Sequence, residues 1–135
     1  MELKRVVVTG LGAVTPLGLN VDETWEALLN GVSGAGPITH FDASQFKTQF
    51  ACEVKNFDPT LYLDKKEVRK FDRYAQFAVA AAKEAVGDSA LDLEKVDKNR
   101  VGVIFAAGIG GIRTFEEEVG GYFTNIERGP KFNPF

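Results

Sequence analysis

The hydrophobic pattern begins with two short runs of apolar, mostly β-branched residues. The first reads RVVVT over residues 5–9, and the second reads RVGVIFAA over residues 100–107. Nearly continuous apolar runs of this length are typical of strands that are covered on both faces of a parallel sheet. Each run leads into a glycine-rich loop, at residues 10–18 and 108–111. The sequence therefore predicts two buried strands, each followed by a loop.

Between the two runs, apolar positions recur with the helical period. A capping-box-like start at Asn20 and an apolar stripe that stops at Gly31 predict a first helix. Alternation over residues 50–54 predicts a short strand. Residues 64–87 carry the strongest helical pattern, which favours two helices that meet near Asp72. The second of these is rich in alanine, so we expect neighbouring elements to bury it on most sides.

A last helix is predicted from near Ile112 to the glycine pair 120–121. Strands that alternate with helices predict an α/β layer architecture. The 135 residues, 44% of them hydrophobic and 26% charged, allow one globular domain with a real core. The tail ends in Phe132-Asn133-Pro134-Phe135, where two aromatic residues have no following element to bury them. The chain is therefore expected to be interrupted at this end.

Charge and cysteine content narrow the classes of function. The net charge of −3 argues against a general nucleic-acid binder, because such domains carry a basic excess. Cys52 is the single cysteine and no charged-then-apolar leader is present, so the cytoplasm is the expected location. No apolar run approaches the roughly 20 residues that a membrane-spanning helix needs. We expect a soluble protein.

The glycine loops invite comparison with dinucleotide-binding fingerprints. Gly10-x-Gly12 follows a predicted strand, but the third glycine position holds Thr15, and no helix is predicted to start there. The loop at 108–110 fails in the same way, with Arg113 in the third position. A glycine turn beside a crowded core is preferred, and a nucleotide-binding domain remains the alternative.

Isolated reactive residues offer little for catalysis. Cys52 has Glu53 beside it, which would raise a thiol pKa, so structural burial is favoured over a role as nucleophile. His40 is the only histidine and is expected to make a structural hydrogen bond. The consecutive carboxylates 116–118 point to different sides of a helix and predict a solvated face. No metal site and no cofactor are expected.

One segment stands out by charge. Residues 65–73 hold five basic and two acidic residues in a chain whose net charge is negative. At about 100° per residue, Lys66, Arg69, Lys70 and Arg73 fall on one helical face. Such a face is either merely solvated or an electrostatic dock for an acidic partner, and the residues alone leave both open.

The order of motifs resembles a known family. RVVVTGLGAVTPLG at 5–18, WEALLNGVSG at 25–34, HFD at 40–42, KKEVRKFDRYAQFAVAAAKEAV and RVGVIFAAGIGG are similar to the opening of the elongating β-ketoacyl-acyl-carrier-protein synthases of type II. The resemblance covers essentially the whole chain. It implies the N-terminal part of a thiolase-type fold, with layered helices and a mixed or parallel sheet. Residues 1–135 would then be the N-terminal portion of a ketoacyl synthase domain, truncated before the catalytic cysteine.

The same resemblance implies a homodimer that elongates fatty acids by decarboxylative condensation of malonyl-acyl carrier protein with an acyl thioester. A cysteine relays the acyl group and histidines stabilise the enolate, and none of these residues lies within this chain. The chain by itself is therefore expected to be inactive. A stand-alone module that binds acyl carrier protein remains a further alternative.

The resemblance also assigns roles to particular residues. Gly108 and Ile109 match the acyl pocket, where the residue at the position of Ile109 gates access of the acyl chain. Lys66, Arg69 and Lys70 match the surface that meets acyl carrier protein. Phe135 is expected to be a pocket aromatic at the dimer interface. The tail is one residue shorter than in related enzymes, so the family position of Lys131 stays open.

Overall fold

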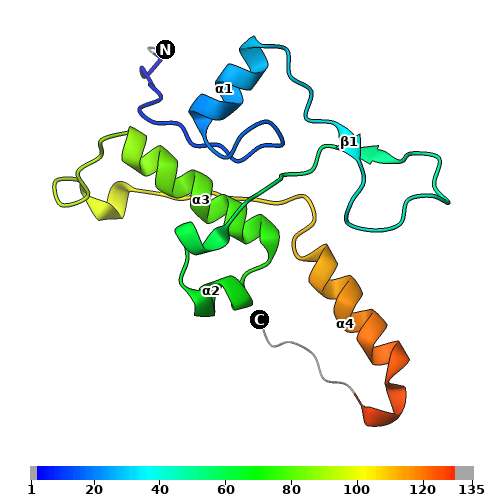
Figure 1. The fold of residues 1–135 in the computed structure, drawn as a ribbon. Helices are drawn as coiled ribbons and strands as arrows, with labels where there is room; N and C mark the ends of the chain where they lie inside the picture. The colour runs from blue at the N-terminus through cyan, green and yellow to red at the C-terminus, as the bar shows by residue number, and fades with distance from the viewer. Residues whose placement is uncertain (1–2, 130–135) are drawn as a thin grey trace. The chain divides into compact units, whose positions relative to one another are not determined.

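The protein is described by a computed structural model that covers residues 3–129 (Figure 1). The chain divides into two compact units. The first is Met1–Asp58 with Ala80–Val96, and the second is Pro59–Val79 with Asp97–Phe135. Because helix α3 (Arg73–Asp88) crosses the division, its beginning belongs to the second unit and its end to the first. Each unit is described on its own below.

In the first unit, α1 (Val21–Leu29) forms where the sequence predicts it. Asn20 is the N-cap, and its side-chain oxygen accepts a hydrogen bond from the Glu23 amide at 2.8 Å. The Glu23 carboxylate in turn accepts from the Leu19 amide at 2.8 Å, so both sides of the start are fastened. The helix ends before Gly31, whose φ of +63° suits glycine. The predicted first helix is confirmed.

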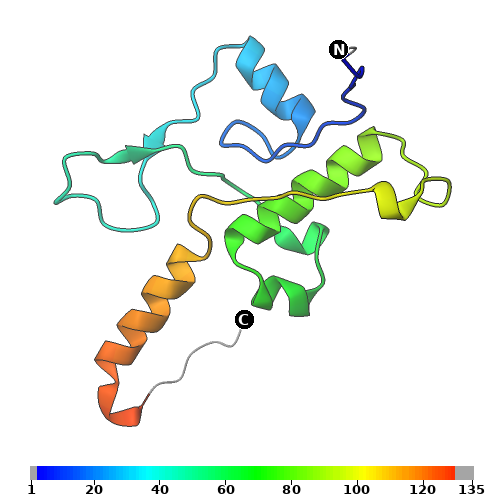
Figure 2. The ribbon, with the colours of Figure 1, turned by 180° about the vertical axis from the view of Figure 1, so that it is seen from behind.

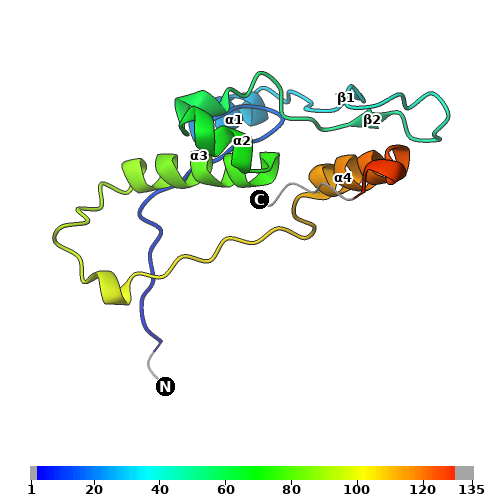
Figure 3. The ribbon, with the colours of Figure 1, turned by 90° about the horizontal axis from the view of Figure 1, so that it is seen from below.

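The first unit contains a very small sheet. Strand β1 (Gly36–Pro37) pairs antiparallel with β2 (Phe50–Ala51), and both are labelled in Figure 3. The ladder is shorter than the predicted strand over 50–54. Beyond the end of β2, the Glu53 carboxylate accepts hydrogen bonds from the amide and hydroxyl of Thr39, at 3.0 and 2.7 Å.

The C-terminal part of α3 packs against the glycine loop at 10–18. Ala80 is only 2% exposed. A side chain at Gly10 or Gly12 would overlap the backbone of α3, at Ala85 and Ala81 respectively. Other alanines of the helix are half-buried or exposed, so the expectation of burial on most sides is wrong. The helix is covered chiefly along the line where the glycines meet it.

The two predicted buried strands are not strands among the described residues. In the first unit, residues 5–9 run as coil, with Val6 87% and Val8 79% exposed. In the second unit, residues 101–107 form the long coil segment before α4 that Figure 2 shows, with Ile104 97% exposed. A strand requires a neighbour to complete its hydrogen bonds. No segment of residues 3–129 supplies that neighbour, so both predictions of secondary structure fail here.

In the second unit, η1 (Pro59–Leu61) precedes α2 (Lys65–Lys70), and α3 begins at Arg73. Asp64 and Glu67 form a full capping box at the start of α2. Leu63 and Gln76 are buried between these elements. Two helices that meet near Asp72 are confirmed.

The rest of the second unit is η2 (Lys98–Arg100), α4 (Ile112–Thr124) and η3 (Ile126–Arg128). Helix α4 continues through the glycine pair 120–121, where the sequence predicts its end. Each glycine costs a helix about 1 kcal/mol, and the caps at Asn125 and Thr124 return hydrogen bonds to the carbonyls of that turn. None of the helices described within residues 3–129 is long and apolar enough to cross a membrane.

Candidate functional site

The basic side chains predicted to dock a partner are exposed on α2. Lys66, Arg69 and Lys70 all face solvent, while Val68 between them is half-buried. The structure therefore brings these three together, as the helical period predicts. Arg73 does not extend the face, because α2 ends at Lys70 and Arg73 begins a new helix. Its guanidinium instead lies over the ring of Phe77, 5.3 Å from the centroid.

The junction between α2 and α3 is held by a buried glutamine. Gln76, 6% exposed, donates from its side-chain nitrogen to the carbonyls of Val68 and Phe71, at 3.0 and 2.8 Å. These carbonyls belong to the last turn of α2 and its cap, which need such donors. Gln76 thereby fixes the end of the basic helix to the start of α3.

The predicted gate loop, residues 108–111, is open on one side. Gly108 has no atom within 4 Å of the position a side chain would take, and Ile109 is 72% exposed. The loop borders an open, mainly apolar recess of about 390 Å³. Its lining residues are Ile109, Gly110, Gly111, Ile112 and Phe115. Substantial apolar surface is thus presented around Ile109.

The other side of the gate loop is fastened to Asp72. The Thr114 hydroxyl, in the first turn of α4, donates to Asp72 Oδ1. Gly111 lies so close to the Asp72 carboxylate that a side chain there would overlap it. Gly110 faces the ring of Tyr74, which lies 3.4 to 3.6 Å from the position of an added Cβ. Asp72 holds the loop where it enters α4, and Tyr74 lies beside it.

The glycine loop of the first unit has its amide donors committed to carboxylates of α3. Glu84 accepts from the amides of Ala13 and Val21, at 2.9 and 2.8 Å, and Asp88 accepts from the Leu11 amide at 2.8 Å. Val21 is the first residue of α1, so a carboxylate of the protein itself already lies at that N-terminus. A bound phosphate would need these same donors. The geometry disfavours the nucleotide-binding alternative.

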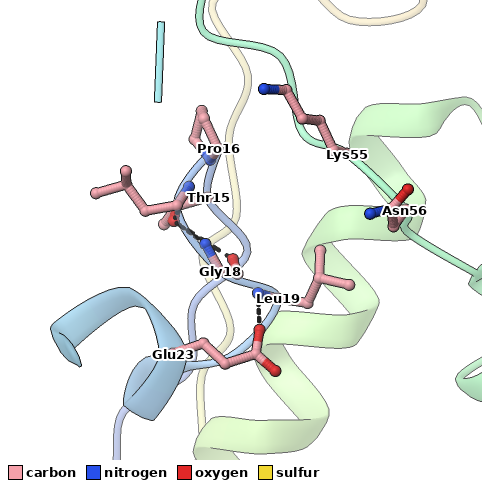
Figure 4. Close-up of a pocket in the computed structure, with 8 residues that line it drawn as sticks. Thr15, Pro16, Gly18, Leu19, Glu23, Lys55 and Asn56 are labelled. Atoms are coloured by element: carbon pink, nitrogen blue, oxygen red, sulfur yellow. Dashed lines mark hydrogen bonds between the residues drawn. The ribbon is translucent and has the colours of Figure 1, made fainter. Parts of the chain in front are cut away.

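The end of this loop borders a pocket of about 270 Å³ (Figure 4). Lys55 and Asn56 lie on one side of it and the turn of Thr15 to Leu19 on the other. The Thr15 hydroxyl oxygen accepts from the Leu17 and Gly18 amides at 3.1 and 3.2 Å. Because the turn satisfies its own donors, few of them converge on the pocket.

The remaining candidates show no catalytic arrangement. Cys52 is exposed, so the predicted burial is wrong; β2 ends at Ala51, before it. His40 is 65% exposed, with Nε2 3.9 Å from Glu53 Oε1. The Thr39 hydroxyl and amide, with His40 nearby, lower the pKa of the Glu53 carboxyl.

The three consecutive glutamates lie on α4, and two of them are exposed. Arg113 Nε donates to Glu117 at 2.8 Å, and this carboxylate raises the pKa of Arg113. Among the described residues, no group of three or more His, Cys, Asp or Glu side chains could hold a metal ion. Lys131 and Phe135 lie outside the described residues, so the expectations for them stay predictions.

Sequence reasoning missed the residues that fasten the two loops. Asp72 was placed only as a helix boundary, and Glu84 and Asp88 were not singled out. A signal existed for the latter pair: they are two carboxylates at i, i+4 in an alanine-rich helix. Nothing in the spacing of Asp72 and Thr114 indicated their contact, since 42 residues separate them.

Solved structures place this arrangement among the α/β folds of the thiolase type. A structure described as the ishigamide ketosynthase/chain length factor aligns with a TM-score of 0.72 and 30% identity, over 95% of this chain and 32% of that chain. A type II PKS acyl-carrier protein in complex with its ketosynthase aligns with a TM-score of 0.73 and 27% identity, over 96% of this chain and 33% of that one. The predicted fold class is confirmed.

Residues 3–129 match the family described as beta-ketoacyl synthase, N-terminal domain, and the chain belongs to that family. It is 49% identical over its full length to 3-oxoacyl-acyl-carrier-protein synthase 2 of Coxiella burnetii. It is 45% identical, again over its full length, to the protein of the same description from Synechocystis. The chain spans about a third of these relatives, 32% of each. The resemblance seen in the sequence is confirmed.

Proposed function

We propose that residues 1–135 are the N-terminal portion of a β-ketoacyl-acyl-carrier-protein synthase that elongates fatty acids. The complete polypeptide would condense malonyl-acyl carrier protein with an acyl thioester and release carbon dioxide. The observation that carries the proposal is identity of 49% over the whole of this chain to a 3-oxoacyl-acyl-carrier-protein synthase 2. Family membership over residues 3–129 supports it.

In this proposal the present chain supplies binding surfaces and no catalytic group. Cys52 is exposed beside Glu53, and His40 is largely exposed at the edge of the small sheet. A covalent relay requires a thiolate with a base in reach. The nucleophilic cysteine and the histidines would lie in the chain that follows residue 135. The complete enzyme is proposed to be a cytoplasmic homodimer, with Phe135 at the interface.

The test compares the 135-residue chain with the polypeptide at the length of its relatives. The longer protein is expected to release carbon dioxide from malonyl-acyl carrier protein and to form a 3-oxoacyl product, followed by mass spectrometry. The 135-residue chain is expected to do neither. Turnover by the short chain, or none by the long one with several acyl donors, would contradict the proposal.

The exposed face of Lys66, Arg69 and Lys70 is proposed to dock the acidic carrier protein. A solved ketosynthase among the structural neighbours is in complex with an acyl-carrier protein, which supports this choice of partner. Gly108 and Ile109 are proposed to border the acyl pocket, with Ile109 as the gate. The open recess and the 72% exposure of Ile109 support a side chain that is able to move.

Docking is tested by charge reversal. The double variant Arg69→Glu with Lys70→Glu is expected to weaken carrier binding by at least about tenfold, because close charge pairs contribute this much to orientation and affinity. Lys4→Glu with Lys47→Glu, at two exposed lysines in the other unit, is the matched control and should leave the dissociation constant unchanged. Equal weakening by both variants would indicate only a general effect of net charge. Binding by the 135-residue chain without turnover would favour the alternative of a stand-alone carrier-binding module.

A further inference from the structure

Asp72 lies at the point where the docking face and the gate loop are both fastened. It follows Lys70 by two residues and directly precedes α3. Its carbonyl oxygen accepts from the Gln76 amide at 3.0 Å, which starts the hydrogen bonding of α3. Its side chain makes a separate connection to α4, because Oδ1 accepts a hydrogen bond from the Thr114 hydroxyl.

On the docking side, Asp72 is connected to α2 through Gln76. The side chain of Gln76 binds the carbonyls of Val68 and Phe71, which lie on either side of the basic residues Arg69 and Lys70. Gln76 is buried, and both of its side-chain protons are used in these two bonds. A displacement of α2 by a partner would therefore displace the α2–α3 junction, including Asp72, because interfaces held this way do not deform freely.

On the gate side, the contact reaches the loop through two neighbouring residues. Thr114 lies in the first turn of α4, and Gly111 is the N-cap of that helix. Gly111 is also pressed against the Asp72 carboxylate, and the Phe115 amide donates to the Gly111 carbonyl at 2.9 Å. At Gly108, the far end of the loop, no atom lies within 4 Å of the position that a Cβ would take. Ile109 thus lies between a held end and an open end.

We propose that Asp72 is a positioning residue that couples occupation of the basic face on α2 to the conformation of the gate loop. This inference rests on the proposed function. The element with two states is the hydrogen bond between Thr114 and Asp72, made in one and broken in the other. Carrier protein at Lys66, Arg69 and Lys70 favours one state, and an acyl chain beside Ile109 favours the same one. By linkage, binding of the carrier protein then strengthens binding of the acyl chain, and the reverse holds equally.

The test cuts the connection and leaves both surfaces intact. Thr114→Val, in the complete polypeptide, removes the hydroxyl that donates a hydrogen bond to Asp72. Acyl transfer is measured with one acyl group on two donors, the carrier protein and pantetheine. With carrier protein kcat/KM is expected to fall about tenfold, within the usual range for a coupling free energy. With pantetheine, which cannot contact α2, kcat/KM should stay within about twofold, as should the Kd of carrier protein that bears no acyl group, because linkage acts only when both ligands are present.

Two variants of α4 serve as controls. Thr124→Val removes another threonine hydroxyl from the same helix, one that donates only to the Gly120 carbonyl at 2.8 Å. It should leave the ratio of the two donors unchanged. Thr114→Ser keeps the hydroxyl and should restore the carrier preference. Recovery with serine separates the hydrogen bond from the shape of the side chain.

Several results would overturn the inference. An equal loss with both donors would make Asp72 a support of the loop alone. A loss of carrier affinity in proportion to the loss of rate would place its effect on docking. If the unsubstituted protein condenses no substrate, the proposed function fails first, and that failure is seen before any variant is made.

A measurement without substitution covers the case in which Thr114→Val does not fold. Addition of carrier protein to the complete polypeptide is expected to change hydrogen exchange of the amides at 108–115 by at least about threefold, since exchange reports local opening. Unchanged exchange at these amides, with protection appearing on α2, would also overturn the inference.

Discussion

The protein contains two glycine loops that look alike in sequence and differ in how they are held. Each follows an apolar run and carries a G-x-G pattern, at Gly10-x-Gly12 and Gly108-x-Gly110. The first loop gives its amides to the carboxylates of Glu84 and Asp88. The second is fastened where it enters α4, by the hydrogen bond between Thr114 and Asp72, and at Gly108 the position of a Cβ is open.

The difference shows that a glycine pattern has several physical causes. At Gly12 the cause is close approach, because the loop lies directly on the backbone of α3 and leaves no space for a Cβ. At Gly108 no atom lies within 4 Å of the position of a Cβ, so close approach is not the cause there. The first loop has the features of a rigid joint, and the second has those of a segment that can move at one end. The following predictions test that contrast.

The largest effect is expected for Gly12→Ala. The added methyl would overlap the carbonyl of Ala81, which is helix backbone and cannot rotate away. We expect a loss of about 3 kcal/mol in the free energy of unfolding, the upper range for forcing extra volume into a packed site. Urea denaturation followed by circular dichroism measures it. Gly108→Ala is the matched control and should change stability by no more than about 0.5 kcal/mol. Similar losses for both alanines would refute the contrast between the loops.

The second prediction concerns the carboxylate of Glu84. Glu84→Ala leaves the amides of Ala13 and Val21 without their acceptor, so we expect destabilisation of about 2 kcal/mol, as for hydrogen bonds to a charged group. Glu84→Gln keeps one oxygen and should lose about half as much. Denaturation of the two variants in parallel provides the measurement. If alanine and glutamine behaved alike, the one oxygen that glutamine keeps would contribute nothing, and the loop would need both oxygens of the carboxylate.

The helices show what the sequence could predict. The boundaries of α1 and the division near Asp72 follow from caps and from the 3.6-residue period, which act within a few residues. The exposed basic face also follows, because three charges on one helix face require no knowledge of the rest of the fold. Family resemblance added the roles of that face and of Ile109, which the pattern alone left open.

The contacts between distant residues could not be predicted. The strands expected at 5–9 and 100–107 require partners, and the described part of the chain supplies none. The pattern over residues 50–54 predicts a strand that contains Cys52, whereas β2 ends at Ala51 and Cys52 is exposed. Asp72 and Thr114 meet only after α2, α3 and α4 are in place. Local sequence patterns do not predict contacts between residues that are far apart in the chain.

A smaller effect is expected for Gly111→Ala, which places a methyl in the Asp72 carboxylate. This obstacle is a side chain that can rotate, unlike the helix backbone behind Gly12. We expect a loss of about 1 kcal/mol, together with loss of the hydrogen bond to Thr114. Combining Gly111→Ala with Thr114→Val should then give less than the sum of the two losses, since both variants break one contact. Strict additivity in denaturation would show that Gly111 and Thr114 act independently.

The smallest effect extends the comparison to a carboxylate beside the small sheet, whose side chain is 12% exposed. Glu53 accepts from the hydroxyl and amide of Thr39, and these bonds lower its pKa below the ordinary 4.5. A carboxyl whose pKa is lowered on folding adds stability above its unfolded-state pKa and loses it as pH falls through the folded-state value. Glu53→Gln should therefore reduce stability near neutral pH and leave it unchanged at the acid end.

Asp42 and Asp92 also have lowered pKa values, so the unsubstituted protein and the variant both keep an acid transition. Only the difference between the two proteins reports on Glu53. Melting temperatures from pH 2 to pH 7, roughly the span over which carboxylates titrate, provide the measurement. A constant difference across that range would show that the contact with Thr39 does not depend on the charge of Glu53. A charged acceptor would then matter at Glu84, where the loop is packed on a helix, and not at Glu53.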